Sequence, residues 1–130
     1  MSSWYLDTSA ALKLLVEEAE SAALAALLDE SQPQLVACWL LETELRRATH
    51  RLPALSQEAV SEFLTGIDLY EVPGAIFREA GLLPGDALRS LDALHLAVAV
   101  RLDVDHVVTY DRRMAEAARA LGVRIAAPGA

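Results

Sequence analysis

The stretch WYLDTSAALKLLV, residues 4 to 16, joins a strand-like run to a helix-like run with an aspartate between them. Trp4 to Leu6 is short and apolar, which is typical of a strand buried in a sheet. Ser9 is a favourable N-cap for a helix from Ala10 to about Val16. The stretch therefore predicts a strand followed closely by a helix, with Asp7 at the carboxyl end of the strand.

The same order of elements returns near the end of the chain. The β-rich run His106 to Tyr110 leads into Asp111, and a helix is expected from about Arg112 to Leu121. Gly122 is a suitable helix terminator, and Val123 to Ala126 supplies a last strand. Two aspartates thus follow two predicted strands directly.

The residues between these stretches continue the alternation. Their spacing predicts helices over about Glu20–Glu30, Leu40–Leu52, Ser56–Leu69, Ala75–Leu82 and Ser90–Leu102, and strands at about Leu35–Ala37 and Tyr70–Val72. Ser56 and Ser90 are the expected caps of their helices. Strands that alternate with helices favour an α/β fold, with a mostly parallel central sheet of about 4–5 strands and helices on both faces.

Length and composition limit the possible architectures. A chain of 130 residues, 54% of them hydrophobic, suits one domain spanning residues 1–130. No apolar run approaches the roughly 18 residues of a membrane span, and no secretory signal is visible, so we expect a cytoplasmic protein without a membrane partner. Cys38 is the only cysteine, which excludes an internal disulfide, and its apolar neighbours indicate a buried structural thiol.

The formal net charge of −8 is unusual for a protein that acts on nucleic acid, because phosphate contacts normally come from lysine and arginine. A divalent cation bound among clustered acids would neutralise part of this charge. All basic residues except Lys13 are arginines, which suit phosphate, although the codon preference of a GC-rich genome explains this bias more simply. An acidic chain also suits a basic protein partner.

Four acidic residues are predicted to lie at one edge of the sheet. Asp7 and Asp111 follow strands, Asp92 lies in the first turn of its helix, and Glu44 lies early in the helix after the second strand. Two like charges about 4 Å apart repel by roughly 4 kcal/mol at an effective dielectric of about 20, so such a group favours a cation. Carboxylate oxygens suit Mg²⁺ or Mn²⁺, and a metal-bound water at such a site can hydrolyse phosphate esters.

A structural interpretation explains the same positions without a metal. Asp7 and Asp111 suit helix caps, Asp92 suits the positive end of a helix dipole, and Glu44 could pair with an arginine on its own helix. With 19 acids in 130 residues, some fall near strand ends by chance. From spacing alone, this structural interpretation is favoured over a metal site.

Four strings resemble, in order and spacing, the four acidic motifs of PIN domains: YLDTSA at residues 5–10, ETELRRA at 42–48, LDALHLAVA at 91–99 and VVTYDRRM at 107–114. The resemblance spans residues 4–126 and is closest to VapC-type toxins of bacterial type II toxin-antitoxin pairs. Matched motif by motif, the family's four metal-binding and catalytic acids fall on Asp7, Glu44, Asp92 and Asp111. Its polar companions near the metal fall on Ser9 and Thr109.

The resemblance implies a PIN-like three-layer sandwich and an endoribonuclease that depends on Mg²⁺ or Mn²⁺ and cuts RNA through a metal-activated water. It also implies a homodimer held inactive by a cognate VapB-type antitoxin. One position departs from the pattern, because several relatives carry a further acid where this chain has Arg113. A second metal site would therefore lack that ligand.

Other polar residues lie within or beside these motifs. Glu42 points about 200° around the helix axis from Glu44, so only one of the two can face a metal, and the motif selects Glu44. His95 lies one turn after Asp92 and could contact substrate or hold the Asp92 carboxylate, but a single histidine on an apolar helix is more often a hydrogen-bonded core residue. Arg89, Arg112 and Arg113 flank motif acids and could hold the RNA backbone.

Two other functions are compatible with parts of the sequence. A phosphoryl-transfer enzyme or receiver domain would use Asp7 as nucleophile or phosphoacceptor, but one such family needs an aspartate where Ser9 stands, and a receiver would have only Lys13 as its lysine. A catalytically silent PIN-fold module would titrate an antitoxin or contribute to operator binding. The presence of all four acids favours the nuclease over both.

Overall fold

The fold is built on a five-stranded sheet, and the computed structural model describes all residues from 1 to 130. The strands are β1 (Ser3–Leu6), β2 (Gln34–Cys38), β3 (Asp68–Tyr70), β4 (His106–Val108) and β5 (Ile125–Ala126). The helices are α1 (Thr8–Leu15), α2 (Ser21–Ser31), α3 (Leu40–Ala48), α4 (Gln57–Leu64), α5 (Gly74–Leu82), α6 (Ser90–Arg101) and α7 (Arg112–Ala120). Every strand pair is parallel, which confirms the predicted α/β class.

The strand order β3-β2-β1-β4-β5 places β1 at the centre of the sheet. Tyr5 of β1 lies in register with Val36 on one side and Val107 on the other. The chain first moves outward from β1 to β3 and then continues on the opposite side of β1 with β4 and β5. Such a reversal opens a crevice beyond the carboxyl ends of the two strands at the switch point, here β1 and β4.

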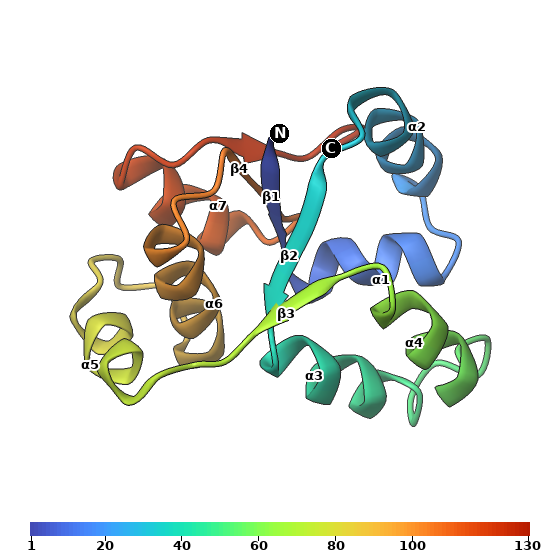
Figure 1. The fold of residues 1–130 in the computed structure, drawn as a ribbon, viewed down its shortest axis with the longest axis horizontal. Helices are drawn as coiled ribbons and strands as arrows, with labels where there is room; N and C mark the ends of the chain where they lie inside the picture. Colours follow the sequence, from blue (N-terminus) through green and yellow to red (C-terminus); the bar gives the residue numbers. More distant parts are fainter.

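Helices cover both faces of the sheet, which confirms the three-layer arrangement. Figure 1 shows α1 to α4 on one side of the strands and α5, α6 and α7 on the other. On one side α1 contacts α2, α3 and α4, and on the other α6 contacts β2, α5 and α7. None of these helices combines the length and the apolar character needed to cross a bilayer.

Helix α6 carries the largest set of buried residues among the helices. Leu96 to Ala99 are all buried, together with Ala93 and His95. A helix that is apolar on nearly all sides belongs in a core, and each buried leucine contributes roughly 1.5–3 kcal/mol. The packing of α6 therefore fixes the position of its first turn, which carries Asp92.

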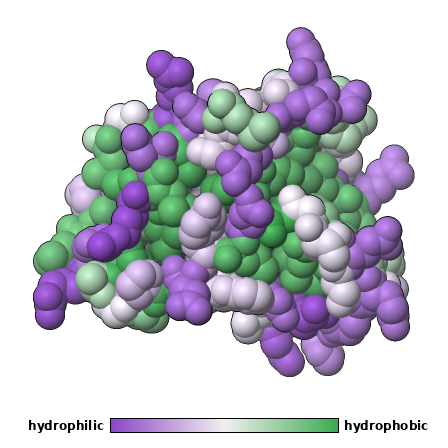
Figure 2. Space-filling view, viewed as in Figure 1, coloured by the Kyte–Doolittle hydropathy of each residue, from purple (hydrophilic) through white to green (hydrophobic).

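Apolar side chains also remain on the surface. Figure 2 shows them over much of one face, with hydrophilic residues gathered mainly around the rim. The exposed large apolar residues include Trp39, Tyr70, Phe77, Leu82 and Leu91. Exposed apolar residues of this size suit contact with another protein.

The expectation that Ser9 caps α1 is wrong. The helix begins at Thr8, and its N-cap is Asp7, whose side chain accepts the N–H of Ala10. Aspartate and serine are both good caps. Ser9 is instead used in a longer-range contact, because its hydroxyl accepts the backbone N–H of Tyr110.

The two other expected caps give different results. Ser56 caps α4 as predicted and accepts the N–H of Ala59. Ser90 is the first residue of α6 rather than its cap, and the capping position is taken by Arg89 in extended conformation. No side chain there bonds to a helix N–H, so the start of α6 is fixed by packing.

Two helices end earlier than the sequence predicts. Helix α3 ends at Ala48 rather than Leu52, and α4 ends at Leu64 rather than Leu69. Just past each end a threonine hydroxyl donates to a backbone carbonyl three residues back, at Thr49 and Thr65 respectively. Such side-chain bonds compete with continuation of the helix. The residues released after α4 form β3, which starts earlier than the predicted strand.

Candidate functional site

Asp7 is a buried carboxylate at the carboxyl end of β1. Its Oδ1 accepts the N–H of Ala10 at 2.9 Å and the hydroxyl of Ser9 at 2.7 Å, and its Oδ2 accepts the hydroxyl of Thr109 at 2.5 Å. The residue is 3% exposed. Burial raises the pKa of Asp7, although the bonds from Thr109, Ala10 and Ser9 act in the opposite direction. The carboxylate is therefore firmly oriented, and its hydrogen bonds do not fully offset the cost of burying its negative charge.

Ser9 and Thr109 join the ends of β1 and β4. The Ser9 hydroxyl accepts the N–H of Tyr110 at 2.9 Å, and the Thr109 hydroxyl accepts the N–H of Asp111 at 3.1 Å. Each hydroxyl also donates to Asp7, so both link the first strand to the segment after the fourth. This pair of links brings the Asp111 segment beside Asp7.

Asp111 caps the last helix. Its Oδ1 accepts the N–H groups of Arg113 at 2.9 Å and Met114 at 3.0 Å. Its Oδ2 has no hydrogen-bond partner in the chain. The structural interpretation of Asp7 and Asp111 as helix caps is correct, yet capping occupies only one oxygen of Asp111 and leaves the other for a ligand.

Glu44 approaches the same edge from α3. Its Oε1 accepts the Thr8 hydroxyl at 2.9 Å and lies 2.5 Å from His95 Nε2. Burial raises the pKa of Glu44, but the contact with His95 and the bond from Thr8 outweigh burial, so the pKa is lowered overall. Glu44 therefore pairs with a buried histidine and not with an arginine of its own helix. Glu42 is the residue that forms such a pair, with Arg46 at 3.2 Å.

Asp92 lies in the first turn of α6 and is partly buried. Its pKa is raised first by burial and then by the negative charge of Asp111, with a further contribution from Glu44. His95 and Arg89 act in the opposite direction. Asp92 thus lies within the electric field of two other motif acids, which brings residues from α3, α6 and the start of α7 to one locality.

His95 is a buried, hydrogen-bonded residue, as the sequence predicts. It is 1% exposed, its Nε2 contacts Glu44, and its Nδ1 lies 2.7 Å from the hydroxyl of Tyr5. The Tyr5 hydroxyl in turn lies 3.2 Å from Sγ of Cys38, which is buried as expected. Burial opposes the charged ring, but contacts with Cys38 and Glu44 raise the pKa of His95 to about 10.

Thr8 and Tyr5 are neighbours of the candidate site that the sequence patterns did not indicate. Thr8 follows Asp7 directly, so the first motif contained it, but only contact with α3 gives it a role. Tyr5 carries a hydroxyl on a buried central strand, and such a group needs a partner. That hydroxyl was the signal available in the sequence.

The four acids provide the hard oxygen donors that Mg²⁺ and Mn²⁺ prefer. No group of three or more histidine, cysteine or acidic side chains forms a ready-made metal cage. Mg²⁺ commonly keeps several waters and binds through one or two carboxylates plus substrate phosphate, so a complete protein cage is not required. The donor chemistry and the like charges around Asp92 fit a divalent cation of this kind.

Exposed arginines flank the acids. Arg89 precedes α6, and Arg112 and Arg113 begin α7, all with exposed side chains and none in an ion pair. Arg112 and Arg119 also line a cavity of about 270 Å³ beside Asp111. A phosphate backbone could approach the acids along these side chains.

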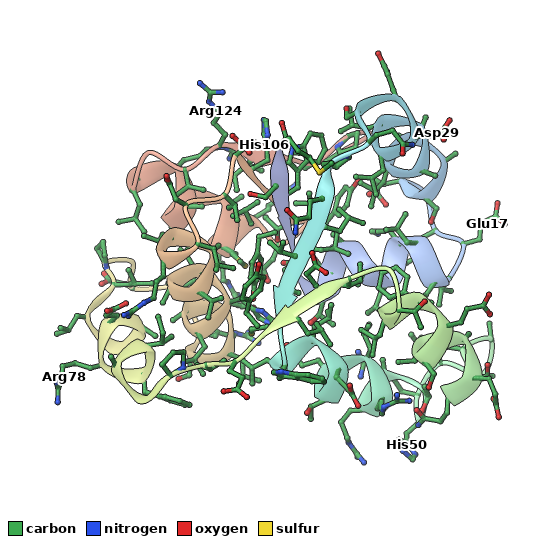
Figure 3. All side chains as sticks on the ribbon, in the orientation of Figure 1. Glu17, Asp29, His50, Arg78, His106 and Arg124 are labelled. Carbon is green, nitrogen blue, oxygen red and sulfur yellow. The ribbon has the colours of Figure 1, made fainter.

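The remaining histidines and several charged residues lie elsewhere. Figure 3 shows His50, Arg78 and Arg124 at the periphery of the molecule. His106 begins β4, at the amino edge of the sheet and thus opposite to the acids.

Comparisons with known proteins agree with this architecture. The family described as PIN domain matches residues 4–120. Ribonuclease VapC35 of Mycobacterium tuberculosis (strain ATCC 25618 / H37Rv) is 41% identical over 96% of this chain and 96% of that protein. Ribonuclease VapC46 of the same strain is 41% identical over 98% of this chain and 99% of that protein.

A solved structure provides an independent match in fold. The chain resembles VapBC2 from Rickettsia felis, which was crystallised bound to a DNA fragment from the promoter, with a TM-score of 0.71 and 12% identity. The match covers 95% of this chain and 97% of that chain. At this low identity the similarity concerns the fold alone.

Proposed function

This chain belongs to the PIN-domain family, within its VapC branch, and we propose that it is the endoribonuclease toxin of a VapBC-type toxin-antitoxin pair. In this proposal the protein hydrolyses RNA phosphodiesters with Mg²⁺ or Mn²⁺ as cofactor. Water, and not the ribose 2′-hydroxyl, attacks the phosphorus and the 3′-oxygen leaves, so the products carry a 5′-phosphate and a 3′-hydroxyl. A cyclic phosphate product would contradict this chemistry.

The observation that most supports the proposal is the environment of Asp92. Asp92 accepts no hydrogen bond from the chain, and Asp111 Oδ2 and Glu44 Oε2 are also without a hydrogen-bond partner. Burial and the charges of Asp111 and Glu44 raise the pKa of Asp92, while His95 and Arg89 act in the opposite direction. Like charges at short range are costly unless a cation is present. A divalent cation at this edge explains both the gathering of the acids and the relation to proteins named ribonucleases.

Each residue has a distinct part in the proposed reaction. Asp7, Glu44, Asp92 and Asp111 hold the metal, which when bound lowers the pKa of a water ligand and stabilises charge on the phosphate. Ser9 and Thr109 keep Asp7 oriented through their hydroxyl bonds. Arg89 and Arg112 bind phosphates of the RNA backbone next to the acids.

The proposal also includes partners. A VapB-type antitoxin covers the toxin in the resting state. The VapBC2 structure from Rickettsia felis, in which a chain of the same fold is part of a VapBC assembly, supports this part of the proposal. A homodimer would cover exposed apolar residues such as Phe77 and Leu82 on α5. We place the protein in the cytoplasm, where both RNA and a cognate antitoxin are present.

Cleavage of RNA by the purified toxin tests the activity. Total bacterial RNA is incubated with antitoxin-free protein and Mg²⁺ or Mn²⁺, and the products are separated on a denaturing gel. EDTA and Asp92→Asn should each abolish discrete cleavage. Asp29→Asn is the matched control because Asp29 is an exposed residue on α2, at the periphery of the molecule in Figure 3. Absence of cleavage by well-folded protein would favour the catalytically silent binding module.

A further inference from the structure

We propose that His95 is a positioning residue that sets the carboxylate of Glu44 for metal binding, and that Tyr5 and Cys38 hold the imidazole from behind. The inference rests on the proposed function, because Glu44 is a proposed metal ligand. It assigns a role to the line of polar contacts formed by Cys38, Tyr5, His95 and Glu44, which the acidic motifs do not explain.

The four residues come from four different elements of the fold. Cys38 ends β2, Tyr5 lies in β1, His95 lies in α6 and Glu44 lies in α3. Tyr5 Oη is 3.2 Å from Cys38 Sγ and 2.7 Å from His95 Nδ1, and His95 Nε2 is 2.5 Å from Glu44 Oε1. An unbroken line of polar contacts therefore runs from the carboxyl end of β2 through β1 and α6 to Glu44 on α3.

Burial makes this line of four polar side chains rigid. Tyr5 and Cys38 are 0% exposed and His95 is 1% exposed, so water cannot replace a lost contact. Leaving a buried polar group unpaired costs roughly 1–3 kcal/mol. Both ring nitrogens of His95 have partners, and turning the ring would break both contacts at once. The imidazole therefore has one strongly favoured orientation.

The donors converge on one oxygen of Glu44. Thr8 donates to Oε1 from α1, and His95 approaches the same Oε1 from α6. Oε2 has no hydrogen-bond partner in the chain. This arrangement fixes the carboxylate through one oxygen and leaves the other for a metal ion. A role in packing alone would need neither the aligned Nε2 nor the second anchor at Tyr5.

The size of the expected effect follows from metal proteins in general. Removing a residue that orients a metal ligand typically lowers metal affinity or activity about 10- to 100-fold. We therefore expect His95→Leu to weaken Mn²⁺ binding about 10- to 100-fold, whereas Tyr5→Phe should cause a smaller loss because it removes only the rear anchor.

The test measures Mn²⁺ binding to the full chain without RNA, by electron paramagnetic resonance of free Mn²⁺. His95→Gln should restore much of the affinity lost in His95→Leu, because the glutamine amide can donate to Oε1 from about the place of His95 Nε2. In a Glu44→Gln background, His95→Leu should cause little further loss. Val60→Ala, at a buried position of α4, is the control: it lowers stability but leaves the polar contacts of His95 intact.

Each outcome bears on the proposal. If His95→Leu binds Mn²⁺ as the natural sequence does, or if its loss adds fully to that of Glu44→Gln, His95 does not act through Glu44. If His95→Leu fails to fold, Tyr5→Phe and His95→Gln decide the question. Normal Mn²⁺ affinity in Tyr5→Phe together with lost Mn²⁺ affinity in His95→Gln would overturn the proposal. If the natural sequence itself binds no Mn²⁺ and cuts no RNA, the proposed function fails as well.

RNA cleavage provides a second readout. His95→Leu should lower kcat at limiting Mn²⁺ and recover part of it at high Mn²⁺, with KM for RNA nearly unchanged. A change in KM for RNA alone would indicate a substrate contact and would contradict the positioning role.

Discussion

The two acids at the strand ends differ from the two acids on α3 and α6 in what holds them. Asp7 and Asp111 accept backbone N–H groups of the helices that they begin, so each also stabilises its helix. Glu44 is held by side chains from other elements, and Asp92 is influenced by charge and burial without a hydrogen bond from the chain. Capping explains the first pair. The helix dipole accounts for an acid in the first turn of α6, but it does not account for the closeness of Asp92 to the charges of Asp111 and Glu44.

This difference identifies the residues that are most informative about function. A helix cap is favourable in any protein, and both strand-end acids would be expected even without a ligand. A half-buried aspartate beside other acids and without a donor is unfavourable unless something else binds there. Asp92 is therefore the most discriminating position for the metal proposal.

The largest expected effect is the loss of activity in Asp92→Asn. The substitution keeps size and removes the charge, so cleavage should fall to background. Because burial and nearby acids raise the pKa of Asp92, removing its charge should not lower the melting temperature. Gel assays and thermal unfolding of the same preparation measure both. Retained cleavage would show that Asp92 has no part in metal binding.

Metal-induced stabilisation gives the next largest effect. A ligand that binds only the folded state at about 100 times its Kd adds about 2.7 kcal/mol of stability. Mn²⁺ should therefore raise the melting temperature of the natural sequence and leave Asp92→Asn almost unchanged. Ca²⁺ and Na⁺ at equal ionic strength control for nonspecific screening. Equal shifts in both proteins would place the ion elsewhere.

Without metal, substitutions at the capping acids should affect stability differently from substitutions at the two other acids. Asp7→Ala removes a cap and leaves two hydroxyls without their acceptor, which should cost about 2 kcal/mol. Asp7→Asn can still cap and removes a buried charge whose pKa is raised, so it should be at least as stable as the natural sequence. Asp92→Ala should change stability by less than about 0.5 kcal/mol. Urea denaturation in EDTA measures all three.

A large destabilisation by Asp92→Ala would break this comparison, because it would show a structural role that the contacts do not reveal. Similar destabilisation by Asp7→Asn and Asp7→Ala would show that charge, and not capping, matters at Asp7. Asp111→Ala and Asp111→Asn repeat the test at the other strand end, where the carboxylate caps α7.

The same contrast explains what the sequence could predict. Strand, aspartate and helix follow one another within a few residues around Asp7 and Asp111, so local patterns predicted both the parallel sheet and the position of these acids. The prediction that Ser9 caps α1 was wrong, because Asp7 and Ser9 are both good caps and lie only two residues apart. The hydroxyl of Ser9 bonds to Tyr110, which is a contact across the sheet that no local pattern encodes.

Long-range contacts account for the rest of what was missed. His95 was correctly predicted to be buried, but its contact with Glu44 joins residues 51 positions apart, and its contact with Tyr5 joins residues 90 positions apart. At the early ends of α3 and α4 a threonine hydroxyl bonds back to the helix backbone, which helical spacing does not register. The assignment of the four acids to a metal stays a prediction, which the Mn²⁺ experiments address.

The smallest expected effect concerns the hydroxyl that links β1 to the segment after β4. Ser9→Ala removes the donor to Asp7 and the acceptor of the Tyr110 N–H, which should cost about 1 kcal/mol. In an Asp7→Ala background the cost should fall by about 0.5 kcal/mol or more, because one partner of Ser9 is already absent. Ser31→Ala, at the exposed end of α2, is the control. Strict additivity in urea denaturation would show that Ser9 and Asp7 stabilise the protein independently, and the strand-end acids would then be simple caps instead of parts of one linked crevice.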